Sequence, residues 1–256
     1  MSGLLAGKTA LVMGARNRWS IAWAIAEAYA AQGATLILTY QGDREEKDVR
    51  SLAESVGGAL VMNCDVTDSA QVKSVFERIS KEHGTLHALV HAIAFAKREE
   101  LAGLYADTSR DGYLLAQEVS VFSFVETARY AAELMTEGGS IQTLTFLGAE
   151  RVVPNYNVMG VAKAALEASV RYLAADLGGQ NIRVNGISAG AVKTLAARGI
   201  SDFDQMLKIA ETRAPLRRNV TQQEVAGVSV FLASDLSRSV TGEVIHADNG
   251  FHILGL

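Results

Sequence analysis

The sequence predicts an α/β fold in which helices cover both faces of one doubly wound, seven-stranded parallel sheet. Short apolar runs alternate with longer segments of helical periodicity along the chain. The runs are nearly continuously apolar, as expected for parallel strands that are covered on both faces. These two observations indicate a Rossmann-type fold, whose ligands bind at the carboxyl edge of the sheet.

Each element is predicted from its own residues. The strands are expected at Thr9–Met13, Thr35–Tyr40, Ala59–Cys64, His87–Ile93, Ser140–Phe146, Arg183–Ser188 and Glu243–Ala247. The helices are expected at Ser20–Gln32, Asp43–Ser55, Ser69–His83, Arg110–Met135, Asn157–Leu177 and Gln222–Ser234. Glycines that follow helix ends are expected in the left-handed C-cap conformation, at Gly33, Gly84, Gly138 and Gly178. Helix N-caps are expected at residues 67–69 and at Thr221.

Length and composition limit the classes of protein. The chain has 256 residues, 49% apolar and 20% charged, which fits one domain over 1–256. Its net charge of −4 argues against nucleic acid as the main partner. No apolar run is long enough to span a membrane, and the first residues form no secretory signal. Cys64 is the single cysteine, which fits a cytoplasmic location.

Two further features concern metals and the longest connection. His83, His87 and His91 are spaced four apart, but the last two fall in a predicted strand, which breaks a helical ligand array. We therefore expect no metal site. The connection over 191–218 is long for a loop, so we expect a partly helical lid over a binding site.

The loop after the first strand has the context of a pyrophosphate site. It contains one glycine, Gly14, so the G-x-G-x-x-G pattern is absent. Ser20 is a predicted N-cap, and the small residues after Ile21 permit close packing of the helix on the sheet. The loop is therefore expected to hold a dinucleotide phosphate at the helix N-terminus. The alternative is an ordinary turn between strand and helix.

The next strand ends are expected to contact the rest of a dinucleotide. Gln41 is neutral and Asp43 would repel a 2′-phosphate, which favours NADH over NADPH although Arg44 is close by. Asp65, followed by Val66, is expected to accept from the adenine amino group, and a plain helix cap is the alternative. The small residues from Ile93 to Ala96 let backbone approach a ligand.

Tyr156 and Lys163 are the candidate catalytic pair. Seven residues are nearly two helical turns, so the two side chains are expected on one face. The phenol can exchange a proton, and the ammonium is expected to hold a hydroxyl and to lower the pKa of the phenol. The alternative is an amphipathic residue beside a solvated one.

Four motifs resemble those of bacterial enoyl-acyl carrier protein reductases, a divergent branch of the short-chain dehydrogenase/reductases. They are G-x5-S-x-A at Gly14, Pro154–Gly160 with Lys163, Arg183-Val184-Asn185 through Gly190, and Ala214–Arg218. The Y-x6-K spacing is the specific part. Ordinary members of the wider family use Y-x3-K, and position 159 holds Met159 instead of tyrosine. The similarity runs from Gly7 to about Ile253.

The resemblance implies NADH-dependent reduction of a trans-2-enoyl thioester on acyl carrier protein. Hydride would reach the β-carbon, Tyr156 would stabilise the enolate oxygen, and Lys163 would bind the nicotinamide ribose. The α-carbon proton would come from Tyr156 or from solvent. The cofactor would also contact the run Val192, Lys193, Thr194, Leu195 and Ala196. The substrate would contact Ala96, Tyr156, Met159, Ile200 and Met206.

Two positions depart from the family pattern. Phe146 replaces a second tyrosine, so no acid role is possible there. Ala191 replaces a proline at the root of the lid, which frees its φ angle. Two rival functions remain open at this point: a ketone or sugar reductase, against which Met159 argues, and a catalytically silent protein on the same fold.

Partners are suggested by charge and by the resemblance. Residues 191–218 carry six cations and three carboxylates, which suggests a portal for an acidic carrier protein. A solvated face with internal ion pairs is the alternative. Apolar positions lie on more than one face of the helices at 110–135 and 157–177, and the family implies that these bury in a homotetramer.

Overall fold

The seven expected strands are present in the computed structural model, which describes residues 3–194 and 203–255. All are parallel, in the order β3-β2-β1-β4-β5-β6-β7. Their bounds are β1 Thr9–Met13, β2 Thr35–Tyr40, β3 Leu60–Asn63, β4 Ala88–His91, β5 Gly139–Thr145, β6 Ile182–Ala189 and β7 Val244–Ala247. The predicted Rossmann-type sheet is therefore confirmed, with β1 and β2 as predicted and the ends of the other strands shifted by at most two residues.

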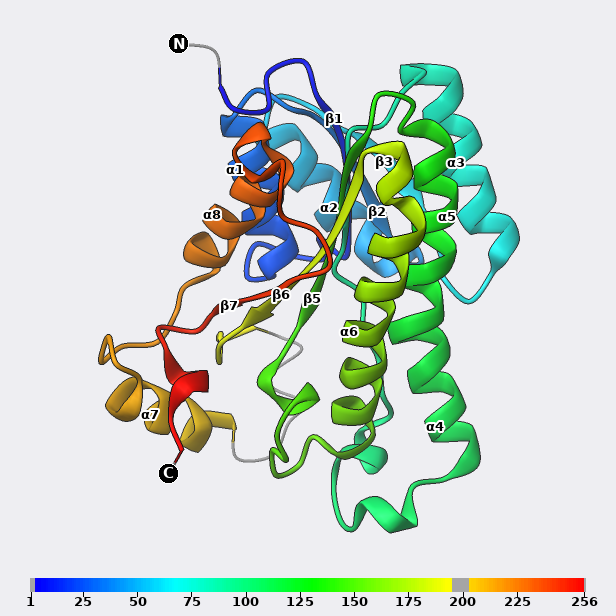
Figure 1. The fold of residues 1–256 in the computed structure, drawn as a ribbon. Helices are drawn as coiled ribbons and strands as arrows, with labels where there is room; N and C mark the ends of the chain where they lie inside the picture. The colour runs from blue at the N-terminus through cyan, green and yellow to red at the C-terminus, as the bar shows by residue number, and fades with distance from the viewer. Residues whose placement is uncertain (1–2, 195–202, 256) are drawn as a thin grey trace.

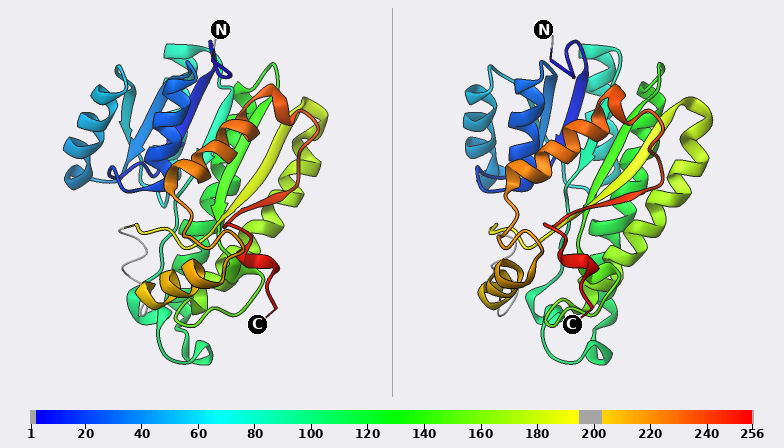
Figure 2. Two further views of the ribbon diagram at one scale, coloured as in Figure 1. Left: turned by 90° about the vertical axis from the view of Figure 1, so that its left-hand side faces the viewer. Right: turned by 60° about the vertical axis from the view of Figure 1, so that its left-hand side comes forward.

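The helices fall in two layers, one on each face of the sheet (Figure 1). One layer contains α1 (Ile21–Ala31), α2 (Asp43–Ser55) and α8 (Gln222–Ala233). The other contains α3 (Ser69–His83), α4 (Arg110–Gln117), α5 (Ser123–Leu134) and α6 (Asn157–Leu177). α7 (Phe203–Arg213) belongs to neither layer and lies beyond the carboxyl ends of β6 and β7 (Figure 2).

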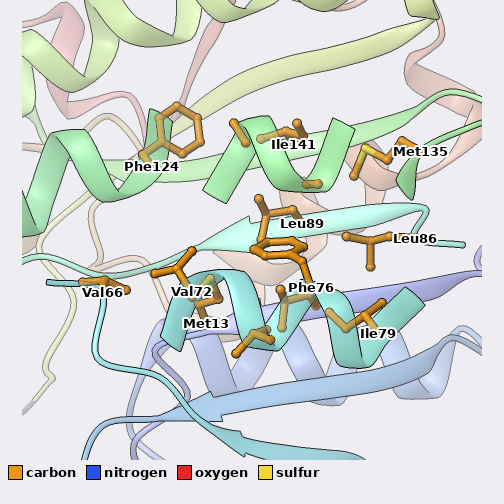
Figure 3. Packing of buried hydrophobic residues seen from close by; sticks show 14 of the residues in the cluster. Met13, Val66, Val72, Phe76, Ile79, Leu86, Leu89, Phe124, Met135 and Ile141 are labelled. Carbon is orange, nitrogen blue, oxygen red and sulfur yellow. The ribbon is translucent and has the colours of Figure 1, made fainter. Parts of the chain in front are cut away.

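Apolar side chains from both layers cover the sheet and form its core. On the α3–α6 side, Phe76 of α3, Leu89 of β4 and Phe124 of α5 belong to one buried cluster, in which Phe76 lies next to Leu89 (Figure 3). On the other side, α1 and α8 bury small and aliphatic residues against β1 and β4. This double burial is why the strands are nearly continuously apolar in sequence.

Two local predictions differ from the structure. The helix expected over 110–135 contains a π-helical turn at Glu118–Phe122, between α4 and α5. Gly178 is not left-handed, with φ −58°, because a 3₁₀ turn continues α6 to Gln180. The left-handed residue is Asn181, with φ 59°. The other three glycines have positive φ, as expected.

The structure identifies the N-cap residues of α3 and α8. Asp68 caps α3 by accepting from the amides of Ala70 and Gln71. Thr221 and Glu224 form a reciprocal capping box at the start of α8. The long connection after β6 is helical where α7 occupies it. From β1 the chain adds strands first on one side of the sheet, up to β3, and then on the other side, from β4 onward. Ligands of open α/β sheets bind at the carboxyl edge where this change of side occurs, between β1 and β4.

Candidate active site

Tyr156 lies at the carboxyl edge, at the first residue before α6. Its side chain is 8% exposed, and its ring meets the ring of Phe146 edge-on, with centroids 5.1 Å apart. Met159 and Ala162 are buried beside it, and Ala96 packs against the same cluster. Three of the predicted substrate residues, Ala96, Tyr156 and Met159, are therefore brought together.

Close backbone packing fixes the position of the Tyr156 ring. A Cβ at Gly148 would overlap the ring, and a Cβ at Gly160 would lie 2.9 Å from the Gly148 carbonyl oxygen. The residues on either side of Tyr156 have positive φ, 60° at Asn155 and 30° at Asn157. Such backbone is uncommon for residues other than glycine and occurs often at functional sites.

The Tyr156 hydroxyl makes no hydrogen bond to any residue in 3–194 or 203–255. Burial raises the pKa of Tyr156 well above its ordinary value. The expectation that Lys163 would lower this pKa is wrong, because burial is the sole cause of the shift. The phenol is therefore protonated at neutral pH, and its O–H group is available to donate a hydrogen bond to a ligand.

Lys163 is buried on α6, with 6% of its surface exposed. Its Nζ donates to the carbonyl oxygen of Leu144 on β5 at 2.7 Å. Within the described part of the chain this is its only hydrogen bond, so two N–H donors remain. Burial lowers the pKa of Lys163 to about 8, and the nearby charge of Glu167 opposes this shift.

The π-helical turn supports the loop that follows β4. Ser120, within the turn, accepts from the amide of Phe95 at 3.1 Å. Ser123, directly after it, lies 2.8 Å from Nε2 of the fully buried His91. Burial lowers the pKa of His91 to about 3, so its ring is neutral at neutral pH. These contacts could not be predicted from the sequence, because serine is a common residue on a helix.

The first loop fits the phosphate role. A Cβ at Gly14 would overlap the carbonyl oxygen of Ala92, and its φ is 96°, so the strand end requires glycine. Ser20 caps α1 by accepting from the Trp23 amide at 3.1 Å. The amides of Ile21 and Ala22 make no hydrogen bond within the described residues. These free donors at a helix N-terminus suit a pyrophosphate.

Asp65, after β3, forms a side-chain hydrogen bond with Gln41, after β2. Partial burial raises the pKa of Asp65, but hydrogen bonds from Thr67 and Gln41 outweigh it and lower that pKa overall. The N-cap of α3 is Asp68, so Asp65 does not cap this helix. Val66 and Ile93 pack into the core, which leaves only their backbone for a ligand.

The residues after β6 are partly described. Val192 is buried, and the Lys193 carbonyl oxygen accepts from Gln222 at the start of α8 at 3.3 Å. Gln222 also donates to Trp19 of the first loop at 3.3 Å. Thr194 therefore follows a residue that Gln222 links by hydrogen bonds to the first loop. Three predicted contacts, Leu195, Ala196 and Ile200, lie outside the described residues.

Met206 lies apart from the Tyr156 cluster. It lines a cavity of about 420 Å³ between α7, β6 and the C-terminal residues. Apolar side chains form most of its wall, and Phe146 and Val153 line this cavity and also pack against the Tyr156 cluster. The predicted substrate residues that the structure describes thus lie in a packed cluster and in a neighbouring cavity, which meet at Phe146 and Val153.

Neither a metal site nor a membrane span is found in the described residues. No three His, Cys, Asp or Glu side chains gather there in a way that could hold a metal ion. No helix in the same residues is both long and apolar enough to cross a membrane.

Comparison with known proteins decides the family. A family model described as enoyl-(acyl carrier protein) reductase matches residues 14–252.

The chain belongs to the enoyl-acyl carrier protein reductase family.

Named relatives of this enoyl reductase are similar over nearly their whole length. The NADH-dependent FabI of Bacillus cereus is 58% identical over 254 residues, 98% of this chain and 99% of the relative. FabI of Bacillus subtilis is 53% identical over 255 residues, 99% of each chain. The resemblance inferred from the motifs is therefore confirmed.

Solved structures agree with the fold of this enoyl reductase. The Bacillus cereus enoyl reductase with NADP⁺ and indole naphthyridinone has a TM-score of 0.98 at 58% identity and covers 99% of this chain and 100% of its own. The Anaplasma phagocytophilum enzyme in complex with NAD has a TM-score of 0.97 at 50% identity, covering 100% and 98%.

Gly148 provides a test of how Tyr156 is positioned. We expect Gly148→Ala to displace the phenol ring and to reduce kcat about 10- to 100-fold, because small misplacements of reacting groups are costly. Gly227→Ala on α8 is the matched control, since a Cβ there meets no atom within 4 Å. The measurement is kcat with an enoyl thioester. Equal kcat in both variants contradicts this role for the backbone.

Proposed function

We propose that the chain reduces the trans-2 double bond of enoyl thioesters on acyl carrier protein, with NADH, in type II fatty acid biosynthesis. Relatives at 58% and 53% identity are named NADH-dependent enoyl-acyl carrier protein reductases. One observation carries the residue roles. A protonated phenol with a free hydroxyl and a buried ammonium with free donors lie at one edge of the sheet.

Tyr156 acts as the hydrogen-bond donor in this mechanism. NADH supplies the hydride when it is bound. As negative charge develops on the thioester oxygen, the Tyr156 hydroxyl donates to that oxygen and stabilises the enolate. The buried, water-poor surroundings of Tyr156 strengthen this hydrogen bond, and Phe146 beside it keeps the surroundings apolar without competing as a donor.

Other residues hold the cofactor. The two remaining N–H groups of Lys163 are donors for the nicotinamide ribose hydroxyls. The free amides of Ile21 and Ala22 bind the pyrophosphate, with Ser20 and Gly14 shaping the loop.

The ribose end of the site suits NADH. Glu45 accepts from the Gln41 amide at 3.3 Å and pairs with Arg16 at 2.5 Å. This carboxylate adds negative charge where a 2′-phosphate would lie and occupies a nearby cation. The arrangement therefore favours NADH over NADPH.

The acyl chain is proposed to run along Ala96 and Met159 and then past Phe146 toward Met206. The segment 191–218, which includes α7, would serve as the lid over this path. Ala191 is buried at its root, next to the cavity.

Tyr156→Phe tests the role of the phenol. We expect kcat for crotonyl-coenzyme A to fall several tens-fold or more, on the order of 10²-fold, because only the hydroxyl is removed. NADH affinity should stay unchanged. The measurement is NADH oxidation, with NADH binding followed by fluorescence.

The same assay separates the rival functions. Turnover of crotonyl-coenzyme A by the wild-type protein supports enoyl reduction. Turnover of an acetoacetyl thioester alone would indicate a ketoreductase, and no turnover of either would indicate a silent protein. An unchanged kcat in Tyr156→Phe would remove Tyr156 from the mechanism.

The cations of the lid region are candidates for carrier docking. Arg218 pairs with Glu224 at 2.5 Å, and Arg217 donates to the Thr212 carbonyl, so these two are engaged within the chain. Lys208 and Arg213 are exposed and form no ion pair with a described residue. Arg198 lies outside the described residues. The basic portal hypothesis therefore rests mainly on α7.

Lys208→Glu tests the portal. We expect it to raise KM for carrier-bound substrate several-fold while leaving KM for the coenzyme A thioester unchanged, because only the acidic carrier is repelled. Lys81→Glu on α3 is the control, since Lys81 is exposed far along the chain from α7. Equal changes in KM for both substrates would refute docking at α7.

We also propose a homotetramer, in keeping with a cytoplasmic enzyme. Large apolar side chains remain exposed on α4, on the π-helical turn that follows it and on α6, which lies beside α4 and α5 in Figure 1. Phe122 is 56% exposed and Tyr172 is 76% exposed. Exposed apolar residues gathered on adjoining helices are typical of a subunit interface.

Light scattering tests this assembly. We expect a mass four times the 27.3 kDa of one chain. Tyr172→Glu should reduce that mass, because a charge would be buried at the interface. Leu236→Glu, at an exposed site away from these helices, should leave it unchanged. A wild-type monomer would exclude the tetramer.

A further inference from the structure

Two consecutive residues of β5 hold two residues of α6. The Leu144 carbonyl oxygen accepts from Lys163 at 2.7 Å, and the Thr145 hydroxyl donates to the Glu167 carboxylate at 2.6 Å. Lys163 and Glu167 are four residues apart on one helix, so their side chains leave the same face, with Cβ atoms about 5–6 Å apart. Strand and helix therefore fix a buried ammonium and a buried carboxylate side by side.

The charge of Glu167 is not explained by an ion pair that stabilises the fold. It is 8% exposed, and no ion pair joins it to a described cation. Burial raises the pKa of Glu167, the Thr145 hydrogen bond opposes this, Glu150 adds to it, and His246 and Arg171 oppose it. A buried carboxylate without an ion pair destabilises a fold, and an apolar residue of similar size would avoid that cost.

Lys163 has few other charged neighbours. His91, from β4, is neutral because burial lowers its pKa to about 3. Tyr156, directly before α6, is protonated because burial raises its pKa. Among the described residues, Glu167 is the one group whose charge raises the pKa of Lys163.

We propose that Glu167 is a positioning residue for the cofactor site, whose carboxylate, held by Thr145, keeps the Lys163 ammonium charged at the place where the nicotinamide ribose binds. This inference rests on the proposed role of Lys163. Thr145 fixes the carboxylate from the strand that also fixes the ammonium, so the distance between the two charges is set by the packing of α6 on β5.

The pH dependence follows from the direction of the shift. The pKa of Lys163 is lowered to about 8, so its charge is complete well below pH 8 and is lost as the pH rises through that value. Removing the Glu167 charge lowers this pKa further. The loss then begins within the physiological range.

The test is a direct titration of Lys163 without cofactor. In protein labelled with [ε-¹³C]lysine, the NMR signal absent from Lys163→Arg identifies Lys163. We expect its titration midpoint to fall by about one pH unit or more in Glu167→Gln, since a charge at this distance is only partly screened. Glu167→Asp, which keeps the charge, should restore most of the wild-type midpoint.

Two results would overturn the proposal: an unchanged midpoint in Glu167→Gln, or an Asp variant that shifts as far as the Gln variant. If Glu167→Gln does not fold, Glu167→Met is the second variant. It has a similar volume and no charge to bury, and the same fall in the midpoint is expected.

NADH binding separates this inference from the proposed function. At pH 8 we expect Glu167→Gln to bind NADH about fivefold more weakly than wild type, and at pH 6 equally well, because Lys163 is charged in both at the lower pH. If wild-type NADH affinity is independent of Lys163 protonation, the role of Lys163 fails. The NMR midpoint still decides the effect of Glu167.

Discussion

The hydrogen bond from the Lys163 ammonium to the Leu144 carbonyl joins α6 to β5 at the carboxyl edge of the sheet. Burying an ammonium costs about several kcal/mol unless neighbours compensate, so this contact and the charge of Glu167 constrain how the helix lies on the strand. That placement sets the start of α6, where Tyr156 meets Gly148 and Phe146. The Lys163 contact and the close packing around Tyr156 thus set the geometry of the site together.

Burial acts on the two key side chains in complementary ways. It raises the pKa of Tyr156, which keeps the phenol protonated and able to donate. It lowers the pKa of Lys163 to about 8, which leaves the ammonium charged at neutral pH but sensitive to its surroundings. A phenol that donates to an enolate and an ammonium that holds a ribose are both supported by this single property, the exclusion of water.

The sequence predicted the sheet, the strand positions, the family and the pair at 156 and 163, because apolar periodicity and the Y-x6-K spacing are local signals. It did not predict the π-helical turn, the shift of the left-handed cap from Gly178 to Asn181, or the raised pKa of Tyr156. Each of these depends on packing between distant segments. Glu167 was missed for the same reason, since a glutamate on a helix is ordinarily solvated.

A structure of the protein with NADH and an enoyl thioester analogue tests the central claim most directly, that Lys163 and Tyr156 serve one site from one edge of the sheet. We predict that Nζ of Lys163 keeps its bond to Leu144 and donates to the ribose hydroxyls, while the Tyr156 hydroxyl donates to the thioester oxygen, both within about 3 Å. A complex in which Lys163 contacts no part of the cofactor, or in which the thioester oxygen lies beyond hydrogen-bond reach of Tyr156, would contradict it.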